Sequence, residues 1–220
     1  MMHILALRLA TTMLAQQHDF YTRVFGFPVL NATSDAVTLQ VGASRLTFVQ
    51  ATAPLPGSYH FAFNISTNQF AAAKRWLSRQ VPLLTNAVGA DEFYSSNWDA
   101  HMLYFGDPAG NIVELIARHT LNNASDLPFD GHSVLNISEI GVAAENVAEQ
   151  VAAIQARTGA PVYRGPGSDT FAPVGDEHGL LIVVQRGRVW FPDTGKPAEH
   201  LPTTAIVAGA EPQPVALHFK

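Results

Sequence analysis

The sequence has no cysteine, few charged residues and no long hydrophobic run. The absence of cysteine among 220 residues excludes disulfides, thiolate zinc sites and cysteine nucleophiles. No apolar run reaches the roughly 18 residues needed to span a membrane. The N-terminal stretch carries Arg8 and lacks a cleavage-site pattern, so we expect no signal peptide and a cytoplasmic location. The 13 lysine and arginine residues are scattered and the net charge is −5, which argues against a nucleic-acid partner.

Three segments repeat one order of strand, amphipathic helix, short strand and hairpin. Their first strands are expected at residues 4–9, 60–65 and 137–143. The turn Gly106-Asp107-Pro108-Ala109-Gly110 of the second segment is echoed by Gly175-Asp176-Glu177-His178-Gly179 in the third. This order describes a βαβββ module, so the predicted fold class is α+β with repeated βαβββ modules.

The modules must pair, because a sheet of this kind leaves one apolar face exposed. We expect residues 1–121 to hold modules 1 and 2, paired around a half-barrel cleft. A polar linker follows at 122–134, a third module at 135–192 and a C-terminal tail at 193–220 that is too short for a complete fourth module. An unpaired third module would expose apolar surface, so we expect a homodimer; cover by the C-terminal tail is the alternative.

A histidine and a carboxylate stand in two of the apolar strands. His60 opens the run His60-Phe61-Ala62-Phe63, and Glu114 lies between Val113 and Leu115. Because a strand alternates its side chains between two faces, such a Glu faces either water or a pocket. Histidine and glutamate together are suitable ligands for a divalent metal. The alternatives are a solvent-facing carboxylate and an edge-strand histidine satisfied by backbone or water.

Two motifs resemble the vicinal oxygen chelate superfamily, which includes glyoxalase I, the extradiol dioxygenases and the bleomycin-resistance proteins. They are Asp19-Phe20-Tyr21…Phe25-Gly26-Phe27 and Asp107-Pro108-Ala109-Gly110-Asn111…Glu114-Leu115, and the similarity extends over residues 4–190. The resemblance implies paired βαβββ modules. In the catalytic members it also implies a divalent metal (Fe, Mn, Ni or Zn), with ligands from the first and last strands of two paired modules.

The resemblance assigns metal-ligand roles to His60 and Glu114 in the second module. Glu114 would also act as the catalytic base if it leaves the metal. The first module departs from the family pattern, because Ala6 stands where the metalloenzymes often have histidine, and Thr47 where some have glutamate.

A third ligand has two candidates. Glu139 occupies the first-strand position of the third module and would serve if that module pairs with the second. The last-strand position of the third module falls on Val183, which offers no ligand. His101 precedes the hairpin strand of the second module and reaches the site in only one of two registers.

The candidates for binding a substrate are Arg8, Arg45, Thr47 and Trp98. Arg8 shares face parity with Ala6, and Arg45 with Thr47, so both arginines are expected to point into the cleft, where they would favour a carboxylate or phosphate. Exposure or a structural ion pair is the alternative for each. Trp98 precedes the hairpin and is expected to wall a pocket, core packing being the alternative.

Two functions from different classes follow. The first is a glyoxalase- or dioxygenase-like enzyme whose metal binds a small-molecule substrate through two oxygens and stabilises an enediolate or positions a catechol-like substrate. The second is a metal-free binding protein of the bleomycin-resistance type, in which His60 and Glu114 are only polar lining. The missing ligand at Ala6 favours the second; the retained pair favours the first.

Overall fold

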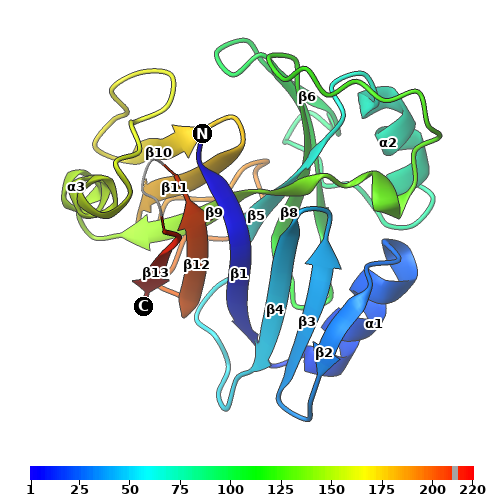
Figure 1. Cartoon of the computed structure of the whole chain (residues 1–220), viewed down its shortest axis with the longest axis horizontal. Coiled ribbons are helices and arrows are strands. Elements are labelled where there is room, and N and C mark those ends of the chain that lie inside the picture. The colour runs from blue at the N-terminus through cyan, green and yellow to red at the C-terminus, as the bar shows by residue number, and fades with distance from the viewer. Residues whose placement is uncertain (210–212) are drawn as a thin grey trace.

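The computed structural model describes residues 1–209 and 213–220, and within them the strands form two sheets (Figure 1). Sheet A has the order β13 (Val215–Phe219), β12 (Thr203–Ala208), β1 (His3–Thr11), β4 (Ser44–Gln50), β3 (Ala36–Val41) and β2 (Val29–Ala32). Sheet B has the order β10 (Phe171–Asp176), β11 (Gly179–Gln185), β9 (Asn136–Ala144), β5 (His60–Ile65), β8 (Ile112–Arg118), β7 (Ala100–Gly106) and β6 (Phe93–Ser95). The α+β class and the βαβββ repeat are confirmed.

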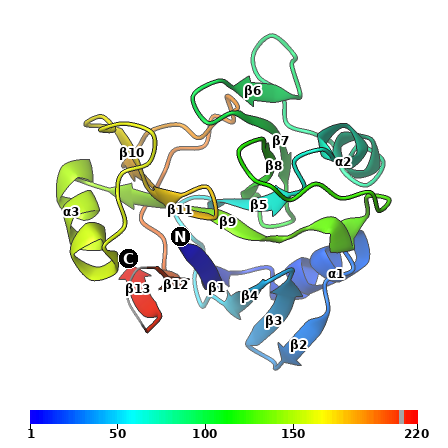
Figure 2. The same cartoon turned by 45° about the horizontal axis from the view of Figure 1, so that its top comes forward.

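The helices lie at the two sides of the molecule, with α1 (Leu14–Val24) and α2 (Phe70–Leu77) on one side and α3 (Val147–Thr158) on the other (Figure 2). The Asn146 side chain caps α3 by accepting a hydrogen bond from the Glu149 backbone N–H at 3.2 Å. Gly159 ends this helix with a φ of +65°, a conformation that glycine adopts without strain. None of the described helices is long and apolar enough to cross a membrane.

The modules pair in an order that differs from the expectation. Module 2 joins module 3 through the antiparallel pair β5–β9, and module 1 joins the tail through β1–β12. Figure 1 shows the red tail strands beside the blue first strand, so both ends of the chain share sheet A. The local pattern located the first strand of each module, but it carried no information on which edges of the modules would pair. The homodimer was expected because an unpaired third module would expose apolar surface. The third module is paired with the second, so this reason no longer applies, and the homodimer stays a prediction.

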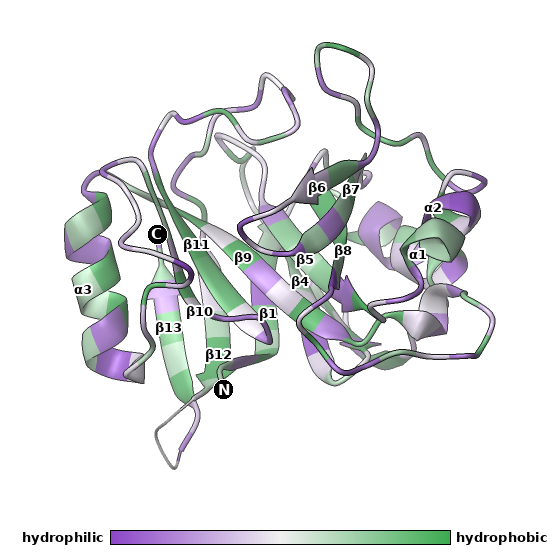
Figure 3. Cartoon of the chain, turned by 90° about the horizontal axis from the view of Figure 1, so that it is seen from above, coloured by the Kyte–Doolittle hydropathy of each residue, from purple (hydrophilic) through white to green (hydrophobic). Residues whose placement is uncertain are grey.

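One hydrophobic core joins the two sheets through the aromatic face of α1. The Tyr21 ring lies 5.4 Å from that of Phe48 in sheet A, and the Phe25 ring lies 6.0 Å from that of Phe63 in sheet B. The strands are mainly hydrophobic, and many connecting loops are polar (Figure 3). Burying these rings removes large apolar areas from water and provides most of the driving force for packing the sheets together.

The buried carboxylate of Asp107 connects the two motifs that carry the family resemblance. It accepts hydrogen bonds from the Gln17 amide (2.6 Å), the Tyr21 hydroxyl (3.1 Å) and the Asn111 amide (2.8 Å). Two backbone N–H groups of its own turn also donate to it, at 3.0 Å each. A helix of module 1 is thereby fixed to the β7–β8 turn, and the strand that follows this turn carries Glu114.

Candidate metal centre

Three ionisable side chains from three neighbouring strands of sheet B meet on one face. They are His60 of β5, Glu114 of β8 and Glu139 of β9, and one ligand atom from each lies within 4.8 Å of the others. Ala62 pairs with Glu114 on one side and with Glu139 on the other. The small methyl group of Ala62 therefore lies between the two glutamates. It leaves room on this face of the sheet for the His60 ring and the carboxylate oxygens.

The ring of His60 is held in one orientation. Its Nδ1 lies 3.3 Å from the Ile112 carbonyl oxygen, and because a carbonyl only accepts, this nitrogen carries the proton. The Nε2 lone pair then faces Oε2 of Glu114 at 3.5 Å. Burial lowers the pKa of His60 to about 4, so the imidazole is neutral at physiological pH. A neutral, oriented imidazole is the form that binds a metal.

Glu114 is buried without a complete set of partners. Its Oε1 has no hydrogen-bond partner within the described residues. Burial raises the pKa of this carboxyl well above its ordinary value, and the nearby charge of Glu139 raises it further. Tyr104 stands opposite Glu114 in the β7–β8 ladder, and burial together with the Glu114 charge raises its pKa, so this phenol stays protonated.

Glu139 has a cationic partner. Arg118 donates a hydrogen bond from Nη2 to Oε1 of Glu139, and its Nε donates to the Asn64 amide oxygen at 3.3 Å. The guanidinium also lies 5.3 Å from the centre of the Trp98 ring. Arg118, Glu114 and Glu139 are all buried, so the single guanidinium of Arg118 faces two carboxylates.

This arrangement fits a divalent cation. Two carboxylates and a neutral imidazole are donors suited to Fe(II), Mn(II), Ni(II) and Zn(II). Placing two carboxylates in a buried site with one guanidinium leaves an excess negative charge, which costs free energy unless a proton or a cation neutralises it. The orphaned Oε1 of Glu114 is the atom with an unused lone pair. His60, Glu114 and Glu139 are thus the residues that would hold the metal.

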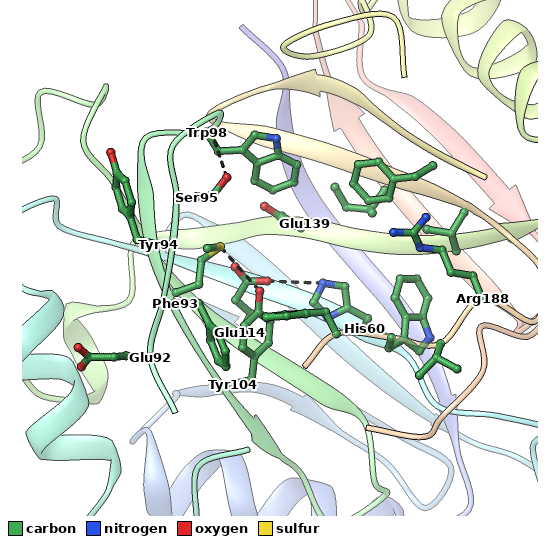
Figure 4. A pocket seen from close by; sticks show the side chains of 17 residues that line it. His60, Glu92, Phe93, Tyr94, Ser95, Trp98, Tyr104, Glu114, Glu139 and Arg188 are labelled. Atoms are coloured by element: carbon green, nitrogen blue, oxygen red, sulfur yellow. Dashed lines mark hydrogen bonds and ion pairs between the residues drawn. The ribbon is translucent and has the colours of Figure 1, made fainter. Parts of the chain in front are cut away.

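A cavity of about 630 Å³ opens above these groups (Figure 4). Seven of its 17 lining residues are aromatic, and Arg188 is the cation at its edge. The aromatic residues that line it are Phe93, Tyr94, Trp98, Tyr104, Phe171, Trp190 and Phe191. A concave apolar cavity with a few polar groups at one end is the usual form of a small-molecule site.

The family model of the Glyoxalase/Bleomycin resistance protein/Dioxygenase superfamily matches residues 3–115. The chain belongs to this superfamily. No curated protein matches the chain. A putative dioxygenase from Bacillus subtilis subsp. subtilis str. 168 is 16% identical, with 83% of this chain and 63% of that protein covered and a TM-score of 0.60. A glyoxalase I mutant from Zea mays is 12% identical, with 99% and 93% covered and a TM-score of 0.58. These structures share the fold.

Four of the residues that the superfamily resemblance or the sequence singled out lie at this site. His60, Glu114 and Glu139 form the ionisable group, and Trp98 lines the cavity. Glu139 satisfies the condition stated for it, because the third module does pair with the second. Their roles in binding a metal or a substrate stay predictions.

His101 does not join the group. It alternates with Met102 along β7, so it lies on the opposite face of sheet B from the cavity. Its Nδ1 lies 2.7 Å from Nε2 of His119, and its ring packs 5.0 Å from that of Phe70. The register of β7 was the open question for this residue, and the observed register turns it away.

The residues proposed in the first module also lie elsewhere. Arg8 and Thr47 pair with each other in sheet A, and Arg45 precedes Thr47 by two residues on the same strand. Thr47 lies 3.0 Å from the Thr38 hydroxyl. None of the three lines the cavity of sheet B, because module 1 pairs with the tail and not with module 2.

The last-strand position of the third module differs by one residue from the expectation. In the second module Gly106 pairs with Ile112, whereas in the third Gly175 pairs with Leu180. The turn of the third module is therefore one residue shorter than that of the second. This shift turns Val183 into the core and Ile182 toward the cavity. An apolar side chain still occupies the fourth ligand position.

Several residues of the site were not predicted from the sequence, among them Arg118, Arg188 and Trp190. Arg118 follows Glu114 by four residues on the same strand, so face parity placed both on one side of the sheet and was a usable signal. Arg188 and Trp190 reach the cavity from the connection between the two sheets. No periodicity in that connection indicated its path.

Proposed function

We propose that the chain is a metal-dependent enzyme of this superfamily that acts on a small molecule with two neighbouring oxygen atoms. His60, Glu114 and Glu139 hold the metal, which is Fe(II), Mn(II), Ni(II) or Zn(II). The observation that carries the proposal is the unpartnered, buried oxygen of Glu114 beside a second buried carboxylate. Such a pair is costly in a protein interior and is relieved by a divalent cation.

The bound metal supplies Lewis-acid polarisation of a substrate oxygen. The residues around it supply the rest. Glu114 would accept a proton from the substrate once it leaves the metal, because burial raises the pKa of the free carboxyl and makes it a stronger base than an exposed carboxylate. The Tyr104 hydroxyl stays protonated beside it and donates a hydrogen bond to a substrate oxygen. The aromatic walls exclude water from the site, which strengthens these electrostatic interactions.

A calorimetric titration of the metal-stripped protein with the four ions tests this proposal. We expect binding to wild type and loss of binding in His60→Ala, Glu114→Gln and Glu139→Gln. His101→Ala is the matched histidine control, because it removes a histidine from the other face of the same sheet. Glu149→Gln is the matched carboxylate control on the exposed side of α3. Equal affinities for the ligand variants and the controls would refute the proposal.

The second candidate is a metal-free binding protein, and the Arg118–Glu139 ion pair favours it. This pair satisfies one of the two carboxylates without a metal. On this reading the cavity holds an aromatic or cationic small molecule, and Glu114 is neutralised by a proton. A wild-type protein that binds none of the four ions but binds an aromatic compound in this cavity would make this the better reading.

A further inference from the structure

The connection between β11 and β12 forms one wall of the cavity. We call residues 187–198 the strap. It is closed by its own backbone hydrogen bonds, from Gly187 N to Ala198 O and from Ala198 N to Arg188 O, both 2.8 Å, and from Trp190 N to Lys196 O at 3.0 Å. Lys196 Nζ also donates to the carbonyl of Gly110, in the turn between β7 and β8. The strap is therefore a fixed wall.

Trp190 is the innermost residue of the strap. Its ring lies 5.2 Å from that of His60, tilted by 37°, and its side chain is 7% exposed. Its Cη2 atom would lie 2.4 Å from a Cβ placed on Gly141 of β9, so any side chain at 141 would displace the indole. Glycine at this position leaves room for a flat surface beside the candidate metal ligands.

The strap also reaches the far side of the cavity. The Phe191 ring lies 4.6 Å from that of Phe93 and 5.4 Å from that of Tyr104. Trp190 and Phe191 thus extend across the sheet from β9 to β6, and their rings line the cavity together with those of Phe93 and Tyr104. Such a space favours a flat ligand, because ring faces and edges contact a planar molecule over its whole surface.

Arg188 stands at the mouth of this space, within reach of solvent (Figure 4). Its Nη1 donates to the Thr170 hydroxyl at 3.2 Å, and its guanidinium lies 5.1 Å from the centre of the Phe171 ring. No carboxylate of the described residues forms an ion pair with it. The other rim charge, Glu92, already pairs with Lys74 at 2.8 Å. A cation held in place beside aromatic walls is suited to a carboxylate or similar anion.

We infer that the strap selects the ligand, and that it favours a flat aromatic compound carrying an anionic group, whose ring lies against Trp190 and whose anion pairs with Arg188. The inference rests on the proposed function only in one respect, namely that the ligand also carries two neighbouring oxygen atoms that face His60 and Glu114. The ring and the anion are recognised by residues outside the metal group.

Three bicyclic probes separate shape from charge. 2-Naphthoate is flat and anionic, 2-naphthalenemethanol is flat and neutral, and decahydro-2-naphthoate is anionic but saturated. We expect wild type, by calorimetry, to bind 2-naphthoate most tightly. Arg188→Gln should weaken 2-naphthoate about tenfold and leave the alcohol unchanged, as expected for one charge-assisted contact near the surface. Arg79→Gln is the charge control, because Arg79 is exposed and outside the cavity lining.

Two substitutions at the platform test the shape. Trp190→Phe keeps a ring and should retain the preference for 2-naphthoate over decahydro-2-naphthoate. Trp190→Leu should remove that preference, and far-ultraviolet circular dichroism checks that both variants are folded. The inference is overturned if wild type binds none of the probes, if Arg188→Gln weakens acid and alcohol equally, or if Trp190→Leu keeps the preference.

The titrations are carried out on metal-loaded and metal-stripped protein. None of the probes carries oxygen atoms on two adjacent carbons. The effects of the Arg188 and Trp190 substitutions should therefore be seen in both the metal-loaded and the metal-stripped protein. A protein that binds no metal but shows the Arg188 and Trp190 effects would refute the proposed function and support the strap. Metal binding without the Arg188 and Trp190 effects would support the proposed function and refute the role of the strap.

Discussion

Binding of the metal should stabilise the fold, and Glu114 should be the residue through which it does so. In the metal-free protein Glu114 and Glu139 are buried opposite the single cation of Arg118. A ligand that binds only the native state at 100 times its dissociation constant stabilises by about 2.7 kcal/mol. For a chain of this size each kcal/mol moves the melting temperature by about 2–4 °C, so we expect a rise of about 5–11 °C.

The pH dependence of stability has a definite sign. Burial raises the pKa of Glu114 in the folded protein above its ordinary value of 4.5. Between these two pKa values the unfolded chain loses this proton while the folded protein keeps it, so the unfolded state gains stability as pH rises. The contribution of Glu114 is favourable below pH 4.5 and is lost as pH rises through the raised pKa. Saturating metal should reverse this loss.

Differential scanning calorimetry across pH 5 to about 8, with and without metal, measures both effects. Glu114→Gln keeps the shape but not the charge, so the metal-free variant should melt at or above the wild-type temperature at the upper end of this range. It should show no shift on adding metal. Glu149→Gln should behave as wild type in both respects. A Glu114→Gln protein that keeps the full metal shift would refute the assignment of Glu114.

Three further outcomes are expected. Metal binding should release a proton from Glu114 at any pH below the raised pKa of that carboxyl, and none from His60 at neutral pH, because its pKa of about 4 leaves it already neutral; calorimetry in buffers of different ionisation enthalpy counts the proton. Arg118→Met should destabilise the metal-free protein by about 3–5 kcal/mol, because it leaves buried carboxylates unpaired, and should tighten metal binding by freeing Glu139; urea unfolding and metal titration measure the two effects. Asp107→Ala should lower stability by at least about 3 kcal/mol in urea unfolding, since it orphans several buried donors at about 1–3 kcal/mol each, whereas the exposed Asp35→Ala should cost less than about 1 kcal/mol.

The elements of the fold were predictable because their signals are local. Helix α1 spans Leu14–Val24, and Val147, Val151 and Ile154, which recur at helical spacing, form the buried stripe of α3. Hydrophobic periodicity, caps and turns act within a few residues of one another, so one sequence reveals them. The pairing of the modules depends on which strand edges meet, and nothing near β1 indicates that its partner is β12 from the end of the chain.

The site residues within one module were predictable from local signals, and those that depend on the pairing of modules were not. His60 and Glu114 belong to one module, and their spacing is fixed by the parallel pair β5–β8. Glu139 depended on the pairing of two modules, and it remained one of two candidates until the β5–β9 register was known. Trp190 reaches His60 from a connection whose path is set by tertiary contacts, so its position was not readable in the sequence.

The path of the chain couples the closing of the cavity to the completion of the other sheet. The chain leaves sheet B at the end of β11, forms the strap and then enters sheet A as β12, which pairs with β1. The Tyr59 hydroxyl holds the start of this strand by donating to the Pro202 carbonyl at 2.8 Å. The strap is therefore held between two paired strands, β11 before it and β12 after it, and Lys196 ties it to the β7–β8 turn. An aromatic wall held at three points costs little conformational entropy when a ligand binds, so the tail that completes module 1 also preorganises the site shared by modules 2 and 3.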